Sequence, residues 1–456
     1  MKRSILILFL LSVSFLNYSQ SWQKIKIAKK VQVPAKDTPT KFLKDTLERM
    51  QRLNRQRPFK DLDYDYGSED TPAPREGALS WQDDSGKFWV FGGIGIDDDY
   101  NSGLFQDLWQ YTPSNTTWKL VKGSRKVLLG RSDNAQDIPL PRRDAMTWVD
   151  KNGDLWLFGG RDYSDNLHYD DMWKFTAKSG IWSAISGTGK FNIKSKRGNK
   201  KKANTGDFPG SRSAASCWTD QSGTMWMFGG VSSGENGGED DYYNDLWQFD
   251  SKKQQWAWIS GEDKPNVKTK HGKKGKEDSQ ILPSPRMKTA VWYDAAANKL
   301  WLYGGYGADT TGARGGGLAD MWNYDIKKDV WTWISGTDAL YSDSEYGIID
   351  RETEISHPGY RYGAITWQDR SGNFWLYGGQ NRLSGNSISI NPFLWRFNMK
   401  SQRWANMTSP VTANITSGGC SFIDPDGGLM IFGGTKLDPY TLQTRPVNDI
   451  WKINTK

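Results

Sequence analysis

Five arginines recur at one fixed position and are the residues of this chain best suited to bind a charged ligand. Arg75, Arg142, Arg212, Arg286 and Arg361 each stand six residues before a tryptophan. A guanidinium group stays charged and can hold a carboxylate or a sulfate through two parallel hydrogen bonds. If the repeats that carry them close into a ring, these side chains form a basic circle at the mouth of a central channel.

Internal ion pairing is the other interpretation of these arginines. A second recurrent position, just before a Leu-Trp, Met-Trp or Ile-Trp pair, is held by Asp107, Asp171, Asp245, Asp320 and Asp449, and by Phe393 in the fifth repeat. The sixth repeat lacks the arginine, and Thr416 aligns there. If each Asp pairs with the arginine of the next repeat, one pair loses both partners together and Asp449 meets Arg75. The spacing leaves both interpretations open.

Few other residues suggest chemistry. The chain has three histidines, His168, His271 and His357, and two cysteines, Cys217 and Cys420. Both cysteines lie on first strands, in the third and sixth repeats, which would face each other across a ring. A disulfide needs Cα atoms within about 7 Å, so we expect two free buried thiols. Acidic stretches at 97–99, 162–171 and 239–241 could hold calcium, or they are solvated loops. The sequence predicts no catalytic residue, no metal site and no cofactor.

The elements that position these residues form six sequence repeats. In each repeat an apolar run, such as FWVFGG or LWLYGG, ends in Gly-Gly, and the pairs begin at Gly92, Gly159, Gly229, Gly304, Gly378 and Gly433. Each repeat can be divided into four strands: one rich in small residues, the apolar run, a strand around the Leu-Trp position, and a strand with a further tryptophan. The 24 tryptophans are therefore interpreted as packing groups, not as a stacking platform for nucleic-acid bases.

The sixth repeat ends after its third strand, and its missing strand is expected at the other end of the chain. The segment Ser21–Ile27, SWQKIKI, is similar to TWKLV at Thr117–Val121 and to the other fourth strands. Such a strand would complete the last sheet and leave no open edge.

These features resemble the Kelch-repeat family, over residues 74–456 and through the closing strand 21–27. The resemblance implies an all-β, six-bladed Kelch-type β-propeller, here one domain over residues 21–456. Kelch enzymes of the galactose oxidase type need a copper site of two Tyr, two His and a thioether-linked Cys, which three scattered histidines do not match. Another Kelch group acts as sialic acid mutarotase with Arg and carboxylate groups at the channel mouth. Only the arginine circle suggests that activity here.

The first 20 residues are interpreted as a cleaved secretory signal, since Lys2 and Arg3 precede an apolar stretch at Ile5–Leu16. We therefore expect export to the periplasm or the extracellular space, and we expect no membrane span. Two lysine-rich runs, 190–202 and 264–276, carry much of the net charge of +8. They are either solvated loops or a surface for a polyanion, for which an anionic polysaccharide is preferred to nucleic acid.

The long connections follow the second and fourth strands, so one face of the ring is expected to carry most of the loops. An insert at 28–73 would lie there, with a helix that presents Leu43, Leu47, Met50 and Leu53 on one side. Loops on a rigid scaffold are where binding usually resides. The sequence therefore predicts a non-catalytic scaffold that binds a protein or a glycan through this face. The alternative is an enzyme or lectin for an anionic sugar at the arginine-lined mouth. The oligomeric state is not predicted.

Overall fold

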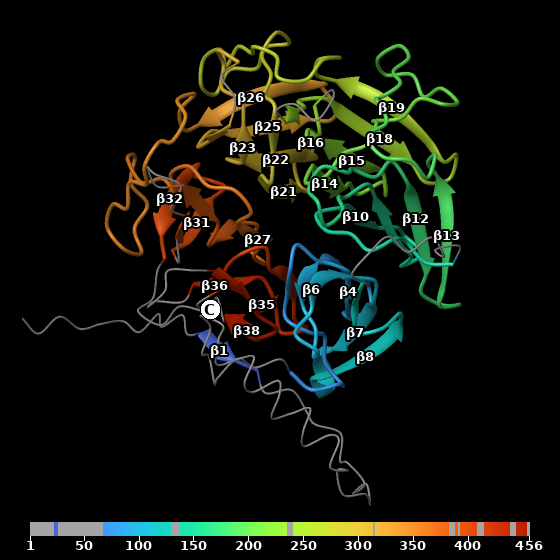
Figure 1. Cartoon of the computed structure of the whole chain (residues 1–456). Coiled ribbons are helices and arrows are strands. Elements are labelled where there is room, and N and C mark those ends of the chain that lie inside the picture. The colour runs from blue at the N-terminus through green and yellow to red at the C-terminus, as the bar shows by residue number, and fades with distance from the viewer. Residues whose placement is uncertain are drawn as a thin grey trace, which may run out of the picture.

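The structure is a ring of small antiparallel β-sheets (Figure 1). It is a computed structural model and describes residues 22–25, 67–128, 137–234, 240–312, 315–382, 388–390, 393–407, 415–437 and 444–453. The predicted signal segment 1–20 and the predicted helix within 28–73 lie outside these residues. In the described residues, no helix has the length and apolar character needed to cross a membrane.

Six sheets of one design make up the ring in the described part of the chain, and we call them blades 1 to 6 in chain order. Their strands, from the inside outward, have the following bounds. Blades 1 to 3 are β3 (Leu79–Gln82), β4 (Phe88–Phe91), β7 (Leu108–Thr112), β8 (Thr117–Lys122); β10 (Met146–Val149), β11 (Leu155–Phe158), β12 (Met172–Thr176), β13 (Ile181–Ser186); β14 (Ser216–Thr219), β15 (Met225–Phe228), β18 (Leu246–Asp250), β19 (Gln255–Ser260). Blades 4 to 6 are β21 (Ala290–Asp294), β22 (Lys299–Tyr303), β25 (Met321–Asp325), β26 (Val330–Ser335); β27 (Ile365–Gln368), β28 (Phe374–Tyr377), β31 (Leu394–Asn398), β32 (Arg403–Asn406); β34 (Cys420–Ile423), β35 (Leu429–Phe432), β38 (Ile450–Ile453), β1 (Trp22–Lys24).

Blade 6 confirms the predicted closure by the amino terminus. Strand β1 pairs antiparallel with β38, and the register places Gln23 opposite Lys452. The innermost strands also contact one another in cyclic order, from β3 through β10, β14, β21, β27 and β34 back to β3. The prediction of an all-β Kelch-type propeller closed by its amino-terminal strand is therefore confirmed.

The hydrophobic core lies between neighbouring blades. Six clusters each combine buried residues of two adjacent blades, and the cluster that contains Phe88 and Phe422 joins blade 1 to blade 6. The second strand of each blade is buried along its whole length, as the FWVF run of β4 shows, except that Lys299 at the start of β22 is only partly buried. This pattern explains why those runs are continuously apolar, since both faces of each sheet are covered by another sheet.

The Gly-Gly pairs join successive repeats. In the first repeat, the Gly93 N–H donates to the Arg142 carbonyl oxygen at 2.9 Å, and a Cβ on Gly92 would lie only 2.6 Å from that oxygen. Gly92 also has a φ of 65°, which disfavours any side chain. The equivalent backbone bond from the last repeat, Gly434 N–H to Arg75 O at 2.8 Å, closes the ring a second time.

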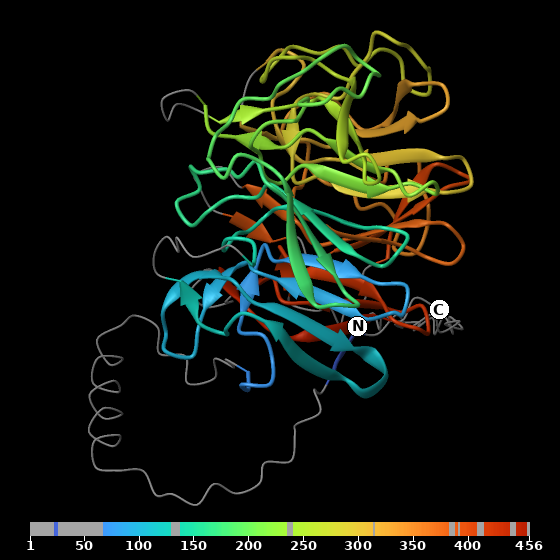
Figure 2. The ribbon, with the colours of Figure 1, turned by 90° about the vertical axis from the view of Figure 1, so that its right-hand side faces the viewer.

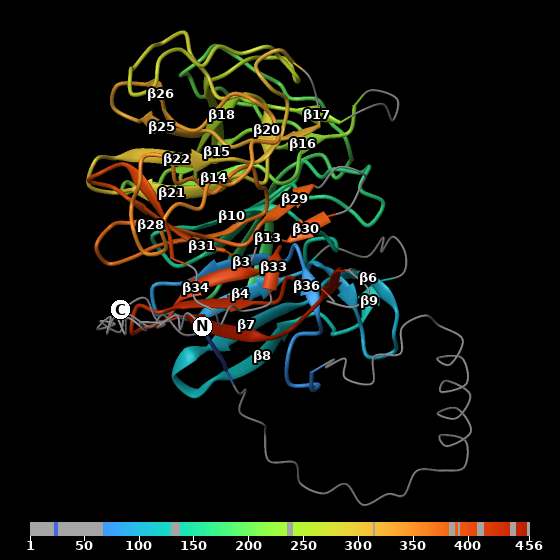
Figure 3. The same cartoon turned by 90° about the vertical axis from the view of Figure 1, so that its left-hand side faces the viewer.

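One face of the ring carries additional short strands, which gather on the right-hand side in Figure 3. They form separate small sheets beside the blades. Their bounds are β2 (Arg75–Glu76), β5 (Ile94–Ile96), β6 (Ser102–Phe105), β9 (Val127–Leu128); β16 (Val231–Ser232), β17 (Asp241–Tyr242); β20 (Arg286–Met287), β23 (Tyr306–Gly307), β24 (Gly316–Gly317); β29 (Gln380–Arg382), β30 (Ile388–Ile390); β33 (Ile415–Ser417), β36 (Thr435–Leu437), β37 (Thr444–Pro446). A short 3-10 helix, η1 (Pro113–Asn115), joins β7 to β8. Figure 2 shows the ring from the side opposite to that of Figure 3.

Candidate functional site

The five predicted arginines are buried inside the blades. Four of them hold the aspartate of their own repeat through two hydrogen bonds, and each of the five donates Nη1 to the carbonyl of the first glycine of its own Gly-Gly pair. The four pairs and their Nη1 to Oδ1 distances are Arg75–Asp107 at 2.6 Å, Arg142–Asp171 at 2.5 Å, Arg212–Asp245 at 2.7 Å and Arg286–Asp320 at 2.5 Å.

The predicted register of these ion pairs is wrong. Each aspartate pairs with the arginine of its own repeat, whereas the sequence analysis paired it with the arginine of the next repeat. The backbone of each arginine does contact the preceding repeat, but its side chain turns toward its own blade, a direction that residue spacing cannot reveal. The expected pair between Asp449 and Arg75 is also absent, because Arg75 binds Asp107. Asp449 instead binds Lys24 of the closing strand at 2.6 Å.

The fifth repeat lacks the aspartate and the sixth lacks the arginine, so with pairing inside each repeat the two missing partners belong to different pairs. Arg361 of the fifth repeat therefore has no carboxylate partner in the described structure. Its guanidinium group is buried and donates to the carbonyl oxygens of Gly378 and Pro358, while its Nε has no acceptor. Burial lowers the pKa of Arg361 to about 10, since a low-dielectric environment disfavours the charged form. The binding role predicted for the five arginines remains a prediction, and their burial indicates a structural role first.

The mouth of the central channel is lined by the residues that directly follow these arginines. This cavity of about 450 Å³ takes residues from all six repeats, and we call it the channel mouth. One residue of each repeat has a left-handed backbone there: Gly77, Asp144, Ala214, Lys288, Gly363 and Gly418. Backbone hydrogen bonds of 2.7 to 3.1 Å join them from Gly418 through to Gly363. A left-handed backbone strains Asp144, Ala214 and Lys288, whereas the other three repeats have glycine at this position.

Charges at the channel mouth are balanced. Asp144 accepts from Arg161 at 2.7 Å and lies 3.3 Å from the Lys288 ammonium group. Burial raises the pKa of Asp144, but Lys288, Arg161 and Arg143 lower it more, so the net pKa is below its ordinary value. Glu76 also lines the channel mouth and has no ion pair among the described residues, and burial raises its pKa. An anion that entered here would have to displace an aspartate from each cation.

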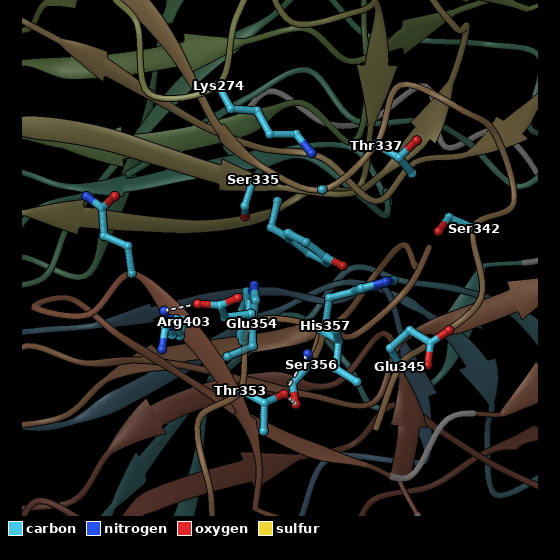
Figure 4. Close-up of a pocket in the computed structure, with 15 residues that line it drawn as sticks. Lys274, Ser335, Thr337, Ser342, Glu345, Thr353, Glu354, Ser356, His357 and Arg403 are labelled. Carbon is cyan, nitrogen blue, oxygen red and sulfur yellow. Dashed lines mark hydrogen bonds and ion pairs between the residues drawn. The ribbon is translucent and has the colours of Figure 1, made fainter. Parts of the chain in front are cut away.

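A second cavity, of about 640 Å³, lies at the outer side of the ring between blades 4 and 5, and we call it the rim pocket (Figure 4). The insert 336–359, which joins β26 to β27, forms much of its wall. Glu354 and Arg403 form an ion pair of 2.6 Å there, and Lys274 lies on the opposite wall. Burial lowers the pKa of His357, which also lines the pocket. Hydroxyl and charged groups on a partly apolar floor suit binding of another molecule.

The insert 336–359 also carries most of the exposed large hydrophobic side chains in the described residues. Five of the nine belong to it: Tyr341, Tyr346, Ile348, Ile349 and Ile355. Ile355, which is 66% exposed, is also part of the rim pocket. Contiguous exposed apolar groups often mark interaction sites. This surface was not predicted, although the apolar residues of the insert are visible in the sequence.

The remaining predicted residues do not converge. In the described part of the chain, no three His, Cys, Asp or Glu side chains are placed to hold a metal ion. Cys217 and Cys420 are free, as predicted, although only Cys420 is fully buried and Cys217 is partly exposed. Burial raises their pKa values to about 11 and about 12. Thiols with such pKa values are poor nucleophiles at neutral pH.

The repeated blades, their Gly-Gly joints and their closure define a Kelch-type propeller, and comparison with known proteins agrees. Residues 136–338 match the family model described as the KLHDC2/KLHL20/DRC7 Kelch-repeats domain. The human Kelch domain-containing protein 1 is 22% identical over 395 residues, which cover 82% of this chain and 79% of that protein. Both findings support a relation of this chain to the Kelch-repeat family.

Proposed function

We propose that this protein is an exported, non-catalytic scaffold that binds a protein partner through the insert 336–359 and the adjoining rim pocket. Kelch repeats mediate protein–protein interactions, so a binding scaffold is the coarse function of the fold. The single observation that supports this site is the concentration of exposed apolar side chains on one insert beside a cavity. Support for export comes from the sequence of residues 1–20 alone.

The alternative, an enzyme or lectin for an anionic sugar, would use the channel mouth. Its three cations, Arg143, Arg161 and Lys288, each lie beside an aspartate. The electrostatics therefore favour the rim over the channel as the binding site.

The proposal is tested with the mature protein as bait in envelope and secreted fractions of its source organism, followed by affinity measurement with the purified partner. The test variant replaces Ile348 and Ile349 with Asp, and the control replaces Tyr163 and Ile181, which are equally exposed on blade 2, with Asp. Loss of apolar contact by two anchors should weaken binding at least about tenfold. The control should bind within about twofold of the wild type.

Equal weakening by both variants, or full binding by the Ile348 and Ile349 variant, would contradict the proposed site. Weakening only on Glu76→Gln and Lys288→Ala would instead support the channel mouth.

A further inference from the structure

Two inserts on adjacent blades carry the same set of lysines. The run KFNIKSKRGNKKK begins at Lys190 and KPNVKTKHGKKGK begins at Lys264, 74 residues later. Five lysines occupy equivalent positions in the two runs: Lys190, Lys194, Lys196, Lys200 and Lys202, and Lys264, Lys268, Lys270, Lys274 and Lys276. Repetition at five positions indicates that these lysines do not merely fill two unrelated loops.

The two runs fold into equivalent hairpins along the outer edges of blades 3 and 4. The N–H of Lys201 donates to the carbonyl of Trp258 in β19 at 2.7 Å, and the N–H of Gly275 donates to that of Trp333 in β26, also at 2.7 Å. Each hairpin thus lies beside the fourth strand of the next blade and covers the open edge of that strand. In Figure 1, β19 and β26 lie at the outer rim with these loops beside them.

One side chain of each hairpin points inward and anchors it. Arg197 binds Asp245 at 2.8 Å, and His271 lies 3.6 Å from Asp320, so each anchor reaches the aspartate that also holds the arginine of that blade. The ten lysines, in contrast, are all exposed. Apart from Lys194, none of them has a carboxylate within ion-pair distance in the described structure.

A third insert shows that the hairpin does not require these lysines. The insert 336–359 makes the same contact with blade 5, since the N–H of Asp350 donates to the carbonyl of Asn406 at 2.8 Å. The position equivalent to Arg197 and His271 is occupied by Tyr346, which packs on Phe393 with ring centroids 4.6 Å apart and remains partly exposed. The five lysine positions are occupied there by Ala339, Asp343, Glu345, Ile349 and Arg351. The same backbone therefore tolerates acidic and apolar residues, and the lysines must serve something other than folding.

The two lysine hairpins adjoin, so their charges form one surface. Arg197 of the first hairpin donates to the carbonyl of Asp263, at the start of the second, at 2.9 Å. One lysine of each hairpin lies over a tryptophan of the neighbouring outer strand. The Lys200 ammonium group is 4.6 Å from the Trp258 ring, and the Lys274 ammonium group is 4.9 Å from the equivalent Trp333 ring. The surface thus repeats one pattern of positive charge from one blade to the next.

We propose that this lysine surface on the rim of blades 3 and 4 binds an acidic polysaccharide. A charge pattern that repeats between blades fits a polymer that repeats its anionic group along the chain. Lysine offers a point charge with three freely rotating donors, which suits carboxylates or sulfates of a flexible polymer better than one fixed bidentate contact. The surface shares Lys274 with the rim pocket and otherwise lies outside the proposed protein-binding site.

The test measures binding of the mature protein to fluorescent polygalacturonate and dextran sulfate, with neutral dextran, poly-L-glutamate and single-stranded DNA as comparison probes. One variant replaces Lys196, Lys200, Lys270 and Lys274 with Gln. A matched control replaces four exposed lysines of blades 1 and 2 with Gln, namely Lys119, Lys122, Lys151 and Lys178. Both variants lower the net charge by four. A further variant, Lys270→Glu with Lys274→Ile, copies two residues of the third insert and so keeps a hairpin of known shape.

We expect the wild type to bind both acidic polysaccharides at about 0.05 M salt and more weakly at about 0.2 M, because salt screens exposed charges. An exposed ion pair is worth about two- to fivefold in affinity, so the four-lysine rim variant should lose at least about tenfold. The control should lose less than about threefold. Equal losses in the two variants would show an effect of net charge alone and overturn the site. Tighter binding of poly-L-glutamate or DNA than of the polysaccharides would overturn the class of partner, as would absence of polysaccharide binding.

Discussion

Two double-mutant cycles distinguish ion pairing within a repeat from ion pairing between repeats. The first combines Arg75→Met with Asp107→Asn. These side chains are fully buried, and their nitrogens and oxygens are 2.6 and 2.8 Å apart. Removal of one partner leaves a buried charge uncompensated, which costs about 3–5 kcal/mol. The double variant leaves neither charge, so it should cost less than the sum, with a coupling free energy of about 2–3 kcal/mol.

The second cycle combines the same Asp107→Asn change with Arg142→Met. Arg142 binds Asp171 at 2.5 Å, so the coupling to Asp107 should be below about 0.5 kcal/mol. The free energy of unfolding is measured by urea titration with tryptophan fluorescence, after a second probe has confirmed a coincident transition. A coupling between Asp107 and Arg142 as large as that between Asp107 and Arg75 would refute pairing within the repeat.

Three further predictions concern single residues. Gly159→Ala places a Cβ 2.4 Å from a backbone oxygen, whereas Gly153→Ala meets nothing within 4 Å at a similar positive φ. Gly159→Ala should therefore be at least about 2 kcal/mol more destabilising in urea titrations. Equal costs would contradict the close backbone contact of the Gly-Gly pair with the next repeat. Arg361→Met should cost at least about 2 kcal/mol less than Arg286→Met, since only Arg286 leaves a buried carboxylate behind; the reverse order of urea midpoints would contradict the unpaired state of Arg361. Burial, aided by a nearby arginine, lowers the pKa of His168 from 6.5 to about 4. The unfolded chain then binds more protons than the folded one at mildly acidic pH, so stability should fall as the pH drops through 6.5, by about 2 kcal/mol at pH 5. His168→Gln should remove this part of the pH dependence, and an unchanged profile would show that another group is responsible.

Strand order and ring closure could be predicted from the sequence because both follow from backbone patterns. Six apolar runs that end in Gly-Gly identify the second strand of each blade. The similarity of Ser21–Ile27 to a fourth strand predicts that this segment completes the last blade. The direction of the arginine side chains could not be predicted in this way. Residue spacing places Arg142 near both Asp107 and Asp171, and only the rotamer decides which of them it binds.

The binding surfaces were less accessible to sequence reasoning for a different reason. The channel mouth is built from single residues after each arginine, and the signal was the exchange of glycine at 77, 363 and 418 for Asp144 and Lys288 in other repeats. The lysine runs were recognised as charged, but their equivalence depends on hairpins that cross to the next blade. Long inserts have no strong periodicity, so their path over the surface depends on tertiary contacts.

The closed ring is the basis of this account, and an engineered disulfide tests it most directly. Gln23 and Lys452 are opposite each other in the register between β1 and β38, where Cα atoms are close enough for a disulfide. The protein with Gln23→Cys and Lys452→Cys should form an intramolecular cross-link upon mild oxidation, detected by mass spectrometry of the peptides. A register control with Gln23→Cys and Ile450→Cys should not. Absence of the first cross-link, or equal yield of the second, would contradict closure of the ring by the amino-terminal strand.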